Sequence, residues 1–222
     1  MTDARIATPA DVLAFWREAG RDRWYARNDA FDAEIRSRFL ATWQKAAAGE
    51  LSPWEASDEG ALALTIVLDQ FPRNLFRGDA ETFSSDPLAR EVASRAIERG
   101  VDTRTDPRLR EFLYLPFEHS EDLDDQERCV ALFSQYDCHP DNLKYAEDHA
   151  DIIRRFGRFP HRNRVLAGRP RPRSRPFSMP AGFPADDGTV TMAGHCRSSA
   201  SPYCAIPQPG LRQFRFTEGE HR

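Results

Sequence analysis

The stretch SDEGALALTIVLDQFPRN, residues 57–74, decides the fold. Residues 61–68 are apolar almost all round, and only Asp69 and Gln70 restore polarity. On pattern alone, an apolar run of this length fits either a buried strand or a buried helix. Ser57 as a helix cap, the alanine and leucine content and the lack of any other strand pattern favour the helix. We therefore predict a central helix that is buried all round.

The segments on both sides carry helix start and stop signals. Residues 9–19 follow Thr8 as N-cap, begin with Pro9 and stop at Gly20. Further helices are predicted from similar signals, over residues 30–48, 87–99, 107–115, 121–136 and 140–156. Ser120 is the expected cap of the helix that starts at 121, and Gly157 the expected end of the last one. The predicted fold is all-α, with stacked antiparallel helix pairs joined by short loops.

Charge and composition exclude several classes of protein. The net charge of −4 divides into −8 over residues 1–167 and +4 over residues 168–222, and an acidic body argues against a nucleic-acid partner. No apolar run approaches the roughly 18 residues of a membrane helix, and no secretory signal pattern is present. The four cysteines form no C-x-x-C pair, so neither a disulfide framework nor a zinc ribbon is expected. We expect a reduced, cytoplasmic protein without membrane contact.

Polar residues gather in three motifs: LDQFPRN (residues 68–74), PFEHSEDLDDQ (residues 116–126) and RFPHRN (residues 158–163). The first and third each contain Phe-Pro followed by Arg-Asn, with His161 inserted in the third. Because proline disrupts a helix, both are expected to form loops that follow helices. Arginine supplies a planar fork of donors, and asparagine can bridge backbone groups on both sides of a turn.

These motifs carry a resemblance to a known family. LDQFPRNLFRG, FLYLPFEHSED and FGRFPHRN, together with FW at 15–16 and FD at 31–32, resemble the bacterial domain-of-unknown-function family 924 over residues 10–166. The resemblance implies a helical, tetratricopeptide-like fold. The chain has no readable 34-residue repeat, so the term describes stacked helix pairs only. The family brings no established reaction, and the resemblance therefore implies kinship and fold but no activity.

We interpret the three motifs as parts of one polar pocket. The arginines fit the carboxylate or phosphate of a small anionic ligand or of a peptide. The candidate ligand-binding residues are Asp69, Gln70, Arg73, Asn74, Glu121, Arg158, Arg162 and Asn163. An alternative is an enzyme, a hydrolase or a small-group transferase, that uses a histidine as acid or base beside a carboxylate. The candidate catalytic residues are His161, His119 and Glu118.

Other interpretations of the same residues stay open. The acids and arginines can instead form a structural network that clamps loop to loop, since buried charges are usually paired. Stacked helix pairs are also typical of protein–protein adaptors. We expect no cofactor and no metal site, because His119, His149 and His161 lack metal-ligand spacing, and we place His149 on the polar side of its helix. Cys129 fits a small core position. The sequence leaves the oligomeric state open.

The C-terminal segment, residues 168–222, differs from the body, residues 1–167. It holds eight of the sixteen prolines and six glycines, and by composition it should be disordered. One interpretation is a basic arm that binds an acidic partner. We favour another: residues from about Ala167 onward are translated out of frame, since a two-base shift permits a capped helix start followed by Phe-Leu and glycines. Resequencing the locus tests this, and an intact frame without an alternative helix-coding frame would refute it.

Overall fold

The computed structural model describes residues 5–136, 138–163 and 165–166. Within these ranges the chain forms α-helices and short 3-10 turns and no β-strand, so the predicted all-α fold is confirmed. The likeness to tetratricopeptide proteins stays a prediction. The predicted tail, residues 168–222, and the proposed frame boundary near Ala167 lie outside the described residues. None of the described helices is long and apolar enough to cross a membrane.

The first helix, α1 (Pro9–Trp24), begins at the predicted cap. The Thr8 hydroxyl accepts a hydrogen bond from the backbone N–H of Asp11, whose side chain bonds back to the Thr8 N–H. At the predicted stop, Gly20 takes φ 67° and ψ 171°, a left-handed φ that favours glycine. The chain resumes helical turns immediately afterwards, so Gly20 kinks α1 where the sequence predicts an end.

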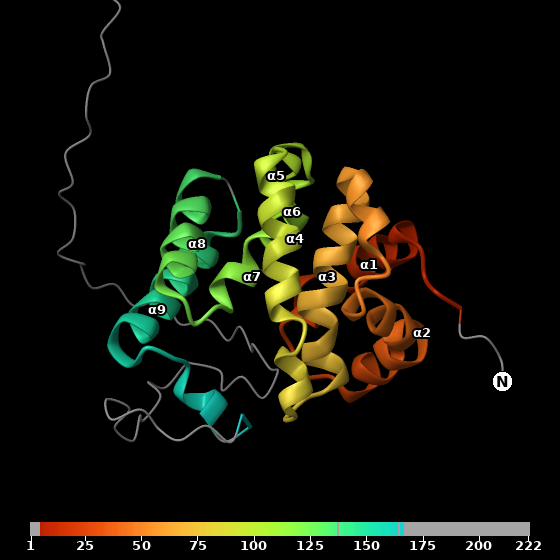
Figure 1. Ribbon diagram of the computed structural model, residues 1–222, viewed down its shortest axis with the longest axis horizontal. Helices are drawn as coiled ribbons and strands as arrows, with labels where there is room; N and C mark the ends of the chain where they lie inside the picture. Colours follow the sequence, from red (N-terminus) through yellow and green to blue (C-terminus); the bar gives the residue numbers. More distant parts are fainter. Residues whose placement is uncertain (1–4, 137, 164, 167–222) are drawn as a thin grey trace, which may run out of the picture. The chain divides into compact units, whose positions relative to one another are not determined.

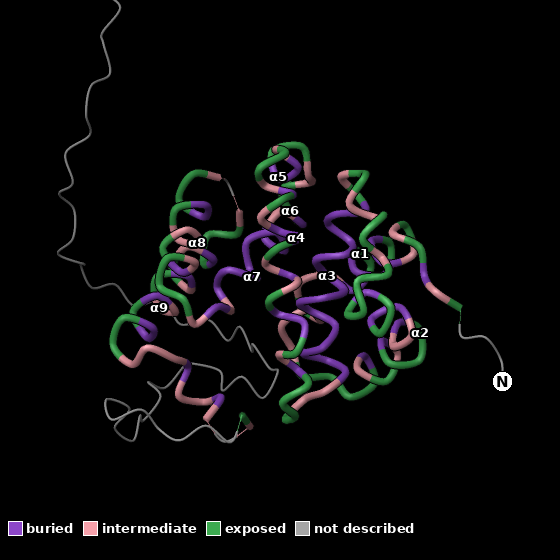
Figure 2. Tube along the Cα trace, viewed as in Figure 1, coloured by how far each residue is buried: buried purple, intermediate pink, exposed green. Residues whose placement is uncertain are grey.

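The next elements along the chain are α2 (Asp29–Ala47), the 3-10 turn η1 (Ser52–Ala56) and α3 (Asp58–Leu75). As predicted, the Ser57 side chain caps α3 by accepting from the Gly60 N–H. Helix α3 packs against α1, α2 and α4, and Figure 1 shows it between α2 and α4. Every residue from 60 to 75 is buried, which Figure 2 shows as purple along α3. The predicted central buried helix is confirmed.

The expectation that LDQFPRN forms a loop is wrong, because α3 continues through it with Pro72 inside the helix. Proline lacks the N–H that would bond to the carbonyl four residues earlier, here that of Leu68. The Ser85 hydroxyl donates to this carbonyl instead, at 2.6 Å between the oxygens, and Trp43 Nε1 donates to the same hydroxyl at 3.2 Å. A side chain from outside α3 thus satisfies the carbonyl that Pro72 leaves without its backbone partner.

The middle of the chain forms a series of short elements: η2 (Ala80–Phe83), α4 (Asp86–Glu98), α5 (Val101–Arg104), α6 (Pro107–Arg110), η3 (Glu111–Leu113) and α7 (Leu115–Glu118). Helix α4 starts and ends close to the predicted signals. The predicted helix from residue 107 to 115 starts correctly but divides into α6, η3 and α7. Pro116 lies in the first turn of α7, which begins at Leu115, whereas its expected role was to end the previous helix.

The last elements that the structure describes are α8 (Leu123–Gln135), α9 (Pro140–Phe156) and η4 (Pro160–Asn163). Ser120 does not cap α8, contrary to the prediction. Asp122 does, by accepting from the Asp124 N–H, while the Ser120 hydroxyl accepts from the Asp122 N–H and donates to Asp125. Gly157 ends α9 with φ 67°, as predicted. Helices α8 and α9 pack against each other (Figure 1).

The core is mainly aromatic where α1, α2 and α3 meet. The buried ring of Phe71 contacts those of Phe15 and Trp16, with centroids 6.4 and 5.7 Å away. Phe39 of α2 packs against both phenylalanines in a tilted arrangement, 4.9 Å from each. Offset and edge contacts at these separations stabilise beyond the apolar area they bury. Cys129 is fully buried, which confirms its predicted core position.

Candidate functional site

The C-terminal half of α3 carries a buried carboxylate at the centre of the polar residues. Asp69 and Arg73 are four residues apart and therefore lie on the same helix face. Asp69 is fully buried and accepts hydrogen bonds from His119 Nδ1 at 2.9 Å and from Gln70 Nε2 at 2.6 Å. Burial alone would raise the pKa of Asp69, but the positive charge of Arg73 and the contact with His119 outweigh it and lower the pKa to about 2. Asp69 is therefore an ionised group inside the fold.

His119 follows α7 and reaches back to α3. Because the ionised Asp69 can only accept, the proton of the 2.9 Å contact belongs to Nδ1 of the imidazole. The His119 side chain is 13% exposed, and its Nε2 makes no hydrogen bond to any described residue. With Nδ1 held by Asp69, Nε2 is the ring nitrogen at which this histidine can bind a ligand or exchange a proton.

A second carboxylate, Asp86, links α3 to the third motif. Arg73 Nη1 and Nη2 donate to the two Asp86 oxygens at 3.2 and 3.4 Å. Nη1 of Arg162, in η4, lies 4.0 Å from Oδ2 of Asp86. The Arg162 guanidinium also packs over the rings of Phe83 and Phe159, at 4.4 and 4.6 Å from their centroids. Two arginines from different motifs therefore meet at one carboxylate.

Phe159 anchors the third motif against the second. Its ring is buried, and its backbone N–H donates to Glu121 Oε1 at 2.9 Å. The imidazoles of His149 and His161 both lie with centroids 5.5 Å from the Phe159 ring. His149 Nδ1 lies 3.6 Å from Glu118 Oε1 and its side chain is 19% exposed. His149 therefore packs inward against the second motif, and its predicted place on the polar side of α9 is wrong.

The three motifs meet in one connected set of side chains, which we call the motif junction: Asp69, Arg73, Asp86, His119 and Arg162. Gln70 bonds to Asp69 of the junction. Glu121 and His161 lie beside it through their contacts with Phe159, and Glu118 through its contact with His149. Among the described residues, it is His119 rather than His161 that contacts Asp69.

Three of the predicted residues stand apart from these contacts. Asn74 turns toward α2, where it donates to Asp32 Oδ1 at 2.8 Å beside the Asp32–Arg77 ion pair. The buried Nε of Arg158 and the buried Oδ1 of Asn163 make no hydrogen bond to the described residues. Buried polar atoms of this kind usually have a partner, which can be water or a ligand.

The sequence interpretation missed Asp86 and Asp32. Asp86 is the first residue of α4, and an acidic residue is common there because its negative charge interacts favourably with the helix dipole. Its position therefore gives no separate signal of a role in the junction. For Asp32 a signal was present, since it is the acid of the FD pair at 31–32 that belongs to the family resemblance.

Two comparisons find that the chain is similar to bacterial proteins of unknown function. The family model described as "Bacterial protein of unknown function (DUF924)" matches residues 12–175, a range that includes all three motifs. A solved structure of a protein of unknown function from Agrobacterium tumefaciens is similar, with 45% sequence identity and a TM-score of 0.71. The match covers 74% of this chain and 92% of that chain. No curated protein matches the chain.

Proposed function

The chain belongs to the DUF924 family of bacterial proteins of unknown function, and we propose that it binds a small anionic ligand at the motif junction. The observation that carries the proposal is the buried Asp69–His119 contact, which leaves Nε2 of His119 without a described partner. A side chain held by a buried carboxylate is pre-organised, so binding costs less conformational entropy. We further propose a cytoplasmic location, which cell fractionation tests.

The donor groups at the junction support an anionic ligand over a cationic one. Arg73 and Arg162 share Asp86, and Arg73 also pairs with Asp69, so two guanidinium groups face two carboxylates. The unsatisfied Nε of Arg158 adds a buried donor in the third motif. Arginine is the residue best suited to planar, two-point recognition of carboxylate and phosphate. A small dicarboxylate or a phosphate monoester fits these donors, and so does the carboxylate of a peptide.

Thermal unfolding with small anions tests the proposal. Inorganic phosphate, citrate, succinate and a short acidic peptide are compared for their effect on the melting temperature. A ligand present at about 100 times its Kd should stabilise the fold by about 2.7 kcal/mol. The His119→Gln variant should lose this stabilisation while it keeps the fold, because an amide can still donate to Asp69.

A matched control and two contradicting outcomes complete this test. Arg155→Ala removes an exposed arginine of α9 that contacts Asp151 and the Phe156 ring, neither of which belongs to the junction, so its ligand response should equal that of the unaltered chain. The proposal is wrong if no anion class raises the melting temperature. It is equally wrong if His119→Gln responds as strongly as the unaltered chain, and the structural-network interpretation then stands.

The same contact favours a second candidate function, catalysis of hydrolysis with His119 as general base. In that reaction Nε2 takes a proton from water as the water attacks, and Asp69 stabilises the imidazolium that forms. Proton transfer of this kind contributes about 10²- to 10⁴-fold to a rate. Hydrolysis of p-nitrophenyl esters and phosphates should therefore fall by about this factor in His119→Gln. An equal rate in both proteins at every pH would exclude this role.

A further inference from the structure

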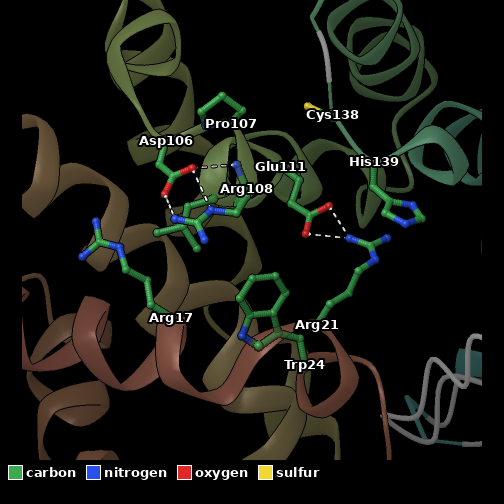
Figure 3. Close-up of a pocket in the computed structure, with 11 residues that line it drawn as sticks. Arg17, Arg21, Trp24, Asp106, Pro107, Arg108, Glu111, Cys138 and His139 are labelled. Atoms are coloured by element: carbon green, nitrogen blue, oxygen red, sulfur yellow. Dashed lines mark hydrogen bonds and ion pairs between the residues drawn. The ribbon is translucent and has the colours of Figure 1, made fainter.

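A cavity that shares no residue with the three motifs lies where α1 passes α6 and the segment before α9 (Figure 3). Its volume is about 450 Å³, within the range of small-molecule sites, about 300–1,000 Å³. Its wall comes from three separate parts of the chain: Arg17, Gly20, Arg21 and Trp24; Asp106, Pro107, Arg108, Leu109 and Glu111; and Cys138 and His139. We call it the α1–α6 cavity.

One wall of the cavity is held rigid by a buried carboxylate, Glu111. Arg21 Nη1 donates to both of its oxygens at 3.0 Å, and the Tyr25 hydroxyl donates to Oε1 at 3.0 Å. Asn142 of α9 donates to Oε2 and accepts from Arg21 Nη2 at 3.0 Å. Burial and the Glu111 charge raise the pKa of Tyr25 well above its usual value, so this hydroxyl stays a donor. The bonds connect α1, η3 and α9 and satisfy Glu111.

The remaining wall offers apolar surface. The Trp24 indole N–H donates to the Trp16 carbonyl at 2.7 Å, so the polar atom of the ring is already satisfied. Figure 3 shows the Trp24 ring between the Asp106–Arg108 pair and the Glu111–Arg21 pair. A side-chain carbon at Gly20 would have no atom within 4 Å, so this glycine leaves open space at the cavity wall that it shares with Trp24. Planar aromatic groups pack well on such a surface.

The charged groups of the cavity leave a positive excess. Arg108 pairs with Asp106 at 2.9 Å, and Arg21 pairs with Glu111. Arg17 makes no hydrogen bond or ion pair with the described part of the chain, although its charge helps Arg108 to lower the pKa of Asp106. Both carboxylates are therefore engaged, whereas one exposed guanidinium is available. This excess occurs in a body whose net charge is negative.

We propose that the α1–α6 cavity binds a small aromatic carboxylate. The carboxylate pairs with the Arg17 guanidinium at the rim, and the aromatic ring lies against Trp24 beside Gly20. The cavity volume, the planar apolar wall and the single uncompensated cation all fit this class of ligand. A dicarboxylate without a ring would leave the apolar wall uncovered, and an uncharged aromatic compound would leave Arg17 without a counter-charge.

Titration with sodium benzoate, followed by the tryptophan indole resonances in ¹H–¹⁵N NMR spectra, tests the proposal. The chain has four tryptophans, of which Trp24 lines this cavity, while Trp43 bonds to Ser85 beside the motif junction. Benzoate should shift the Trp24 resonance and leave that of Trp43 in place, with a Kd of about 1 mM for a fragment of this size. The Trp43 resonance thus reports separately on the site of the proposed function.

Variants make the test specific. Arg17→Ala should weaken benzoate binding about tenfold, and benzyl alcohol should bind the unaltered chain about tenfold more weakly than benzoate. Arg155→Ala, which removes an exposed arginine of another helix, should bind benzoate unchanged. Three results would each overturn the proposal: a Trp24 resonance that does not move, equal affinity of Arg17→Ala and the unaltered chain, or equal affinity for benzoate and benzyl alcohol.

Discussion

LDQFPRN and RFPHRN share Phe-Pro and Arg-Asn, and their backbones differ completely. In the first, Pro72 lies inside α3, where the Ser85 hydroxyl bonds to the Leu68 carbonyl. In the second, Gly157 has already ended α9 before Pro160 begins the 3-10 turn η4. The difference comes from the surroundings. A proline can stay within a helix when another group donates a hydrogen bond to the carbonyl four residues earlier, which the proline itself cannot bond. Contacts from distant elements therefore decide what the same residues form.

The largest expected effect is the loss of unfolding free energy when the arginine of LDQFPRN is replaced, compared with the arginine of RFPHRN. Arg73 lies between the buried carboxylates of Asp69 and Asp86. Arg73→Ala leaves Asp69 without a guanidinium partner and leaves Asp86 with Arg162 alone, 4.0 Å away. Breaking a buried ion pair in this way costs about 3–5 kcal/mol of unfolding free energy. Urea denaturation at neutral pH measures the change.

The corresponding change in RFPHRN, Arg162→Ala, serves as the control. It removes the packing over Phe83 and Phe159 but keeps the Arg73–Asp86 pair. We expect a loss of about 1–2 kcal/mol, because a cation over an aromatic ring contributes on this scale. If Arg162→Ala loses more unfolding free energy than Arg73→Ala, the arginine of LDQFPRN does not contribute more to stability than that of RFPHRN.

The next largest effect is the pH dependence of the unfolding free energy that Asp69, in LDQFPRN, produces. Arg73 and His119 lower its folded pKa to about 2, below the roughly 3.9 of an unfolded chain. The ionised form therefore contributes about 2–3 kcal/mol that is complete above about pH 4 and is lost as the pH falls through 2. Urea midpoints measured from pH 2 to 6 should show this loss. In Asp69→Asn the midpoints should vary less with pH, and an equal slope would contradict the assignment to Asp69.

The contribution of Ser85 to stability should depend on the proline at position 72. Ser85→Ala leaves the buried Leu68 carbonyl without a donor and should cost about 1–2 kcal/mol. In a Pro72→Ala background the restored backbone N–H can bond to that carbonyl, so Ser85→Ala should cost clearly less. A double-mutant cycle in urea measures the coupling. Equal costs in both backgrounds would refute the compensation.

The smallest expected effect concerns Gly157, in the turn before RFPHRN. Gly157 has φ 67°, a conformation that alanine adopts at a cost, so Gly157→Ala should lose about 1 kcal/mol. Gly157→Asn should lose less, because asparagine tolerates the left-handed region. Thermal unfolding of both variants measures the difference. Equal stability of the alanine variant and the unaltered chain would show that the turn does not depend on this glycine.

Local signals were enough to predict most of the fold. Thr8, Ser57 and Gly157 cap or end their helices as predicted, because each signal acts within a few residues of itself. The path of α3 through Pro72 was not predictable, since the compensating hydroxyl comes from Ser85, in another part of the chain. The cap of α8 was ambiguous because serine and aspartate fill that role equally well.

The candidate site was predictable as a group but not in its pairings. Arginines, acids and histidines concentrated at three motifs are enough to predict that the motifs meet. Which histidine contacts Asp69 depends on how α7 and η4 pack against α3, and no local pattern encodes that packing. The α1–α6 cavity had still less signal, because Arg17, Trp24 and Leu109 look like ordinary residues of amphipathic helices.

The burial of α3 also has a consequence for motion. A helix without a solvent-facing side cannot open locally without separating the elements packed around it, so its amide protons should exchange with solvent only when the whole domain unfolds. Asp69 and Arg73 stand on this helix, and His119 is bonded to it. The junction is therefore attached to a helix that we expect to open only with the whole domain. Any movement needed for function must then come from the short elements around it.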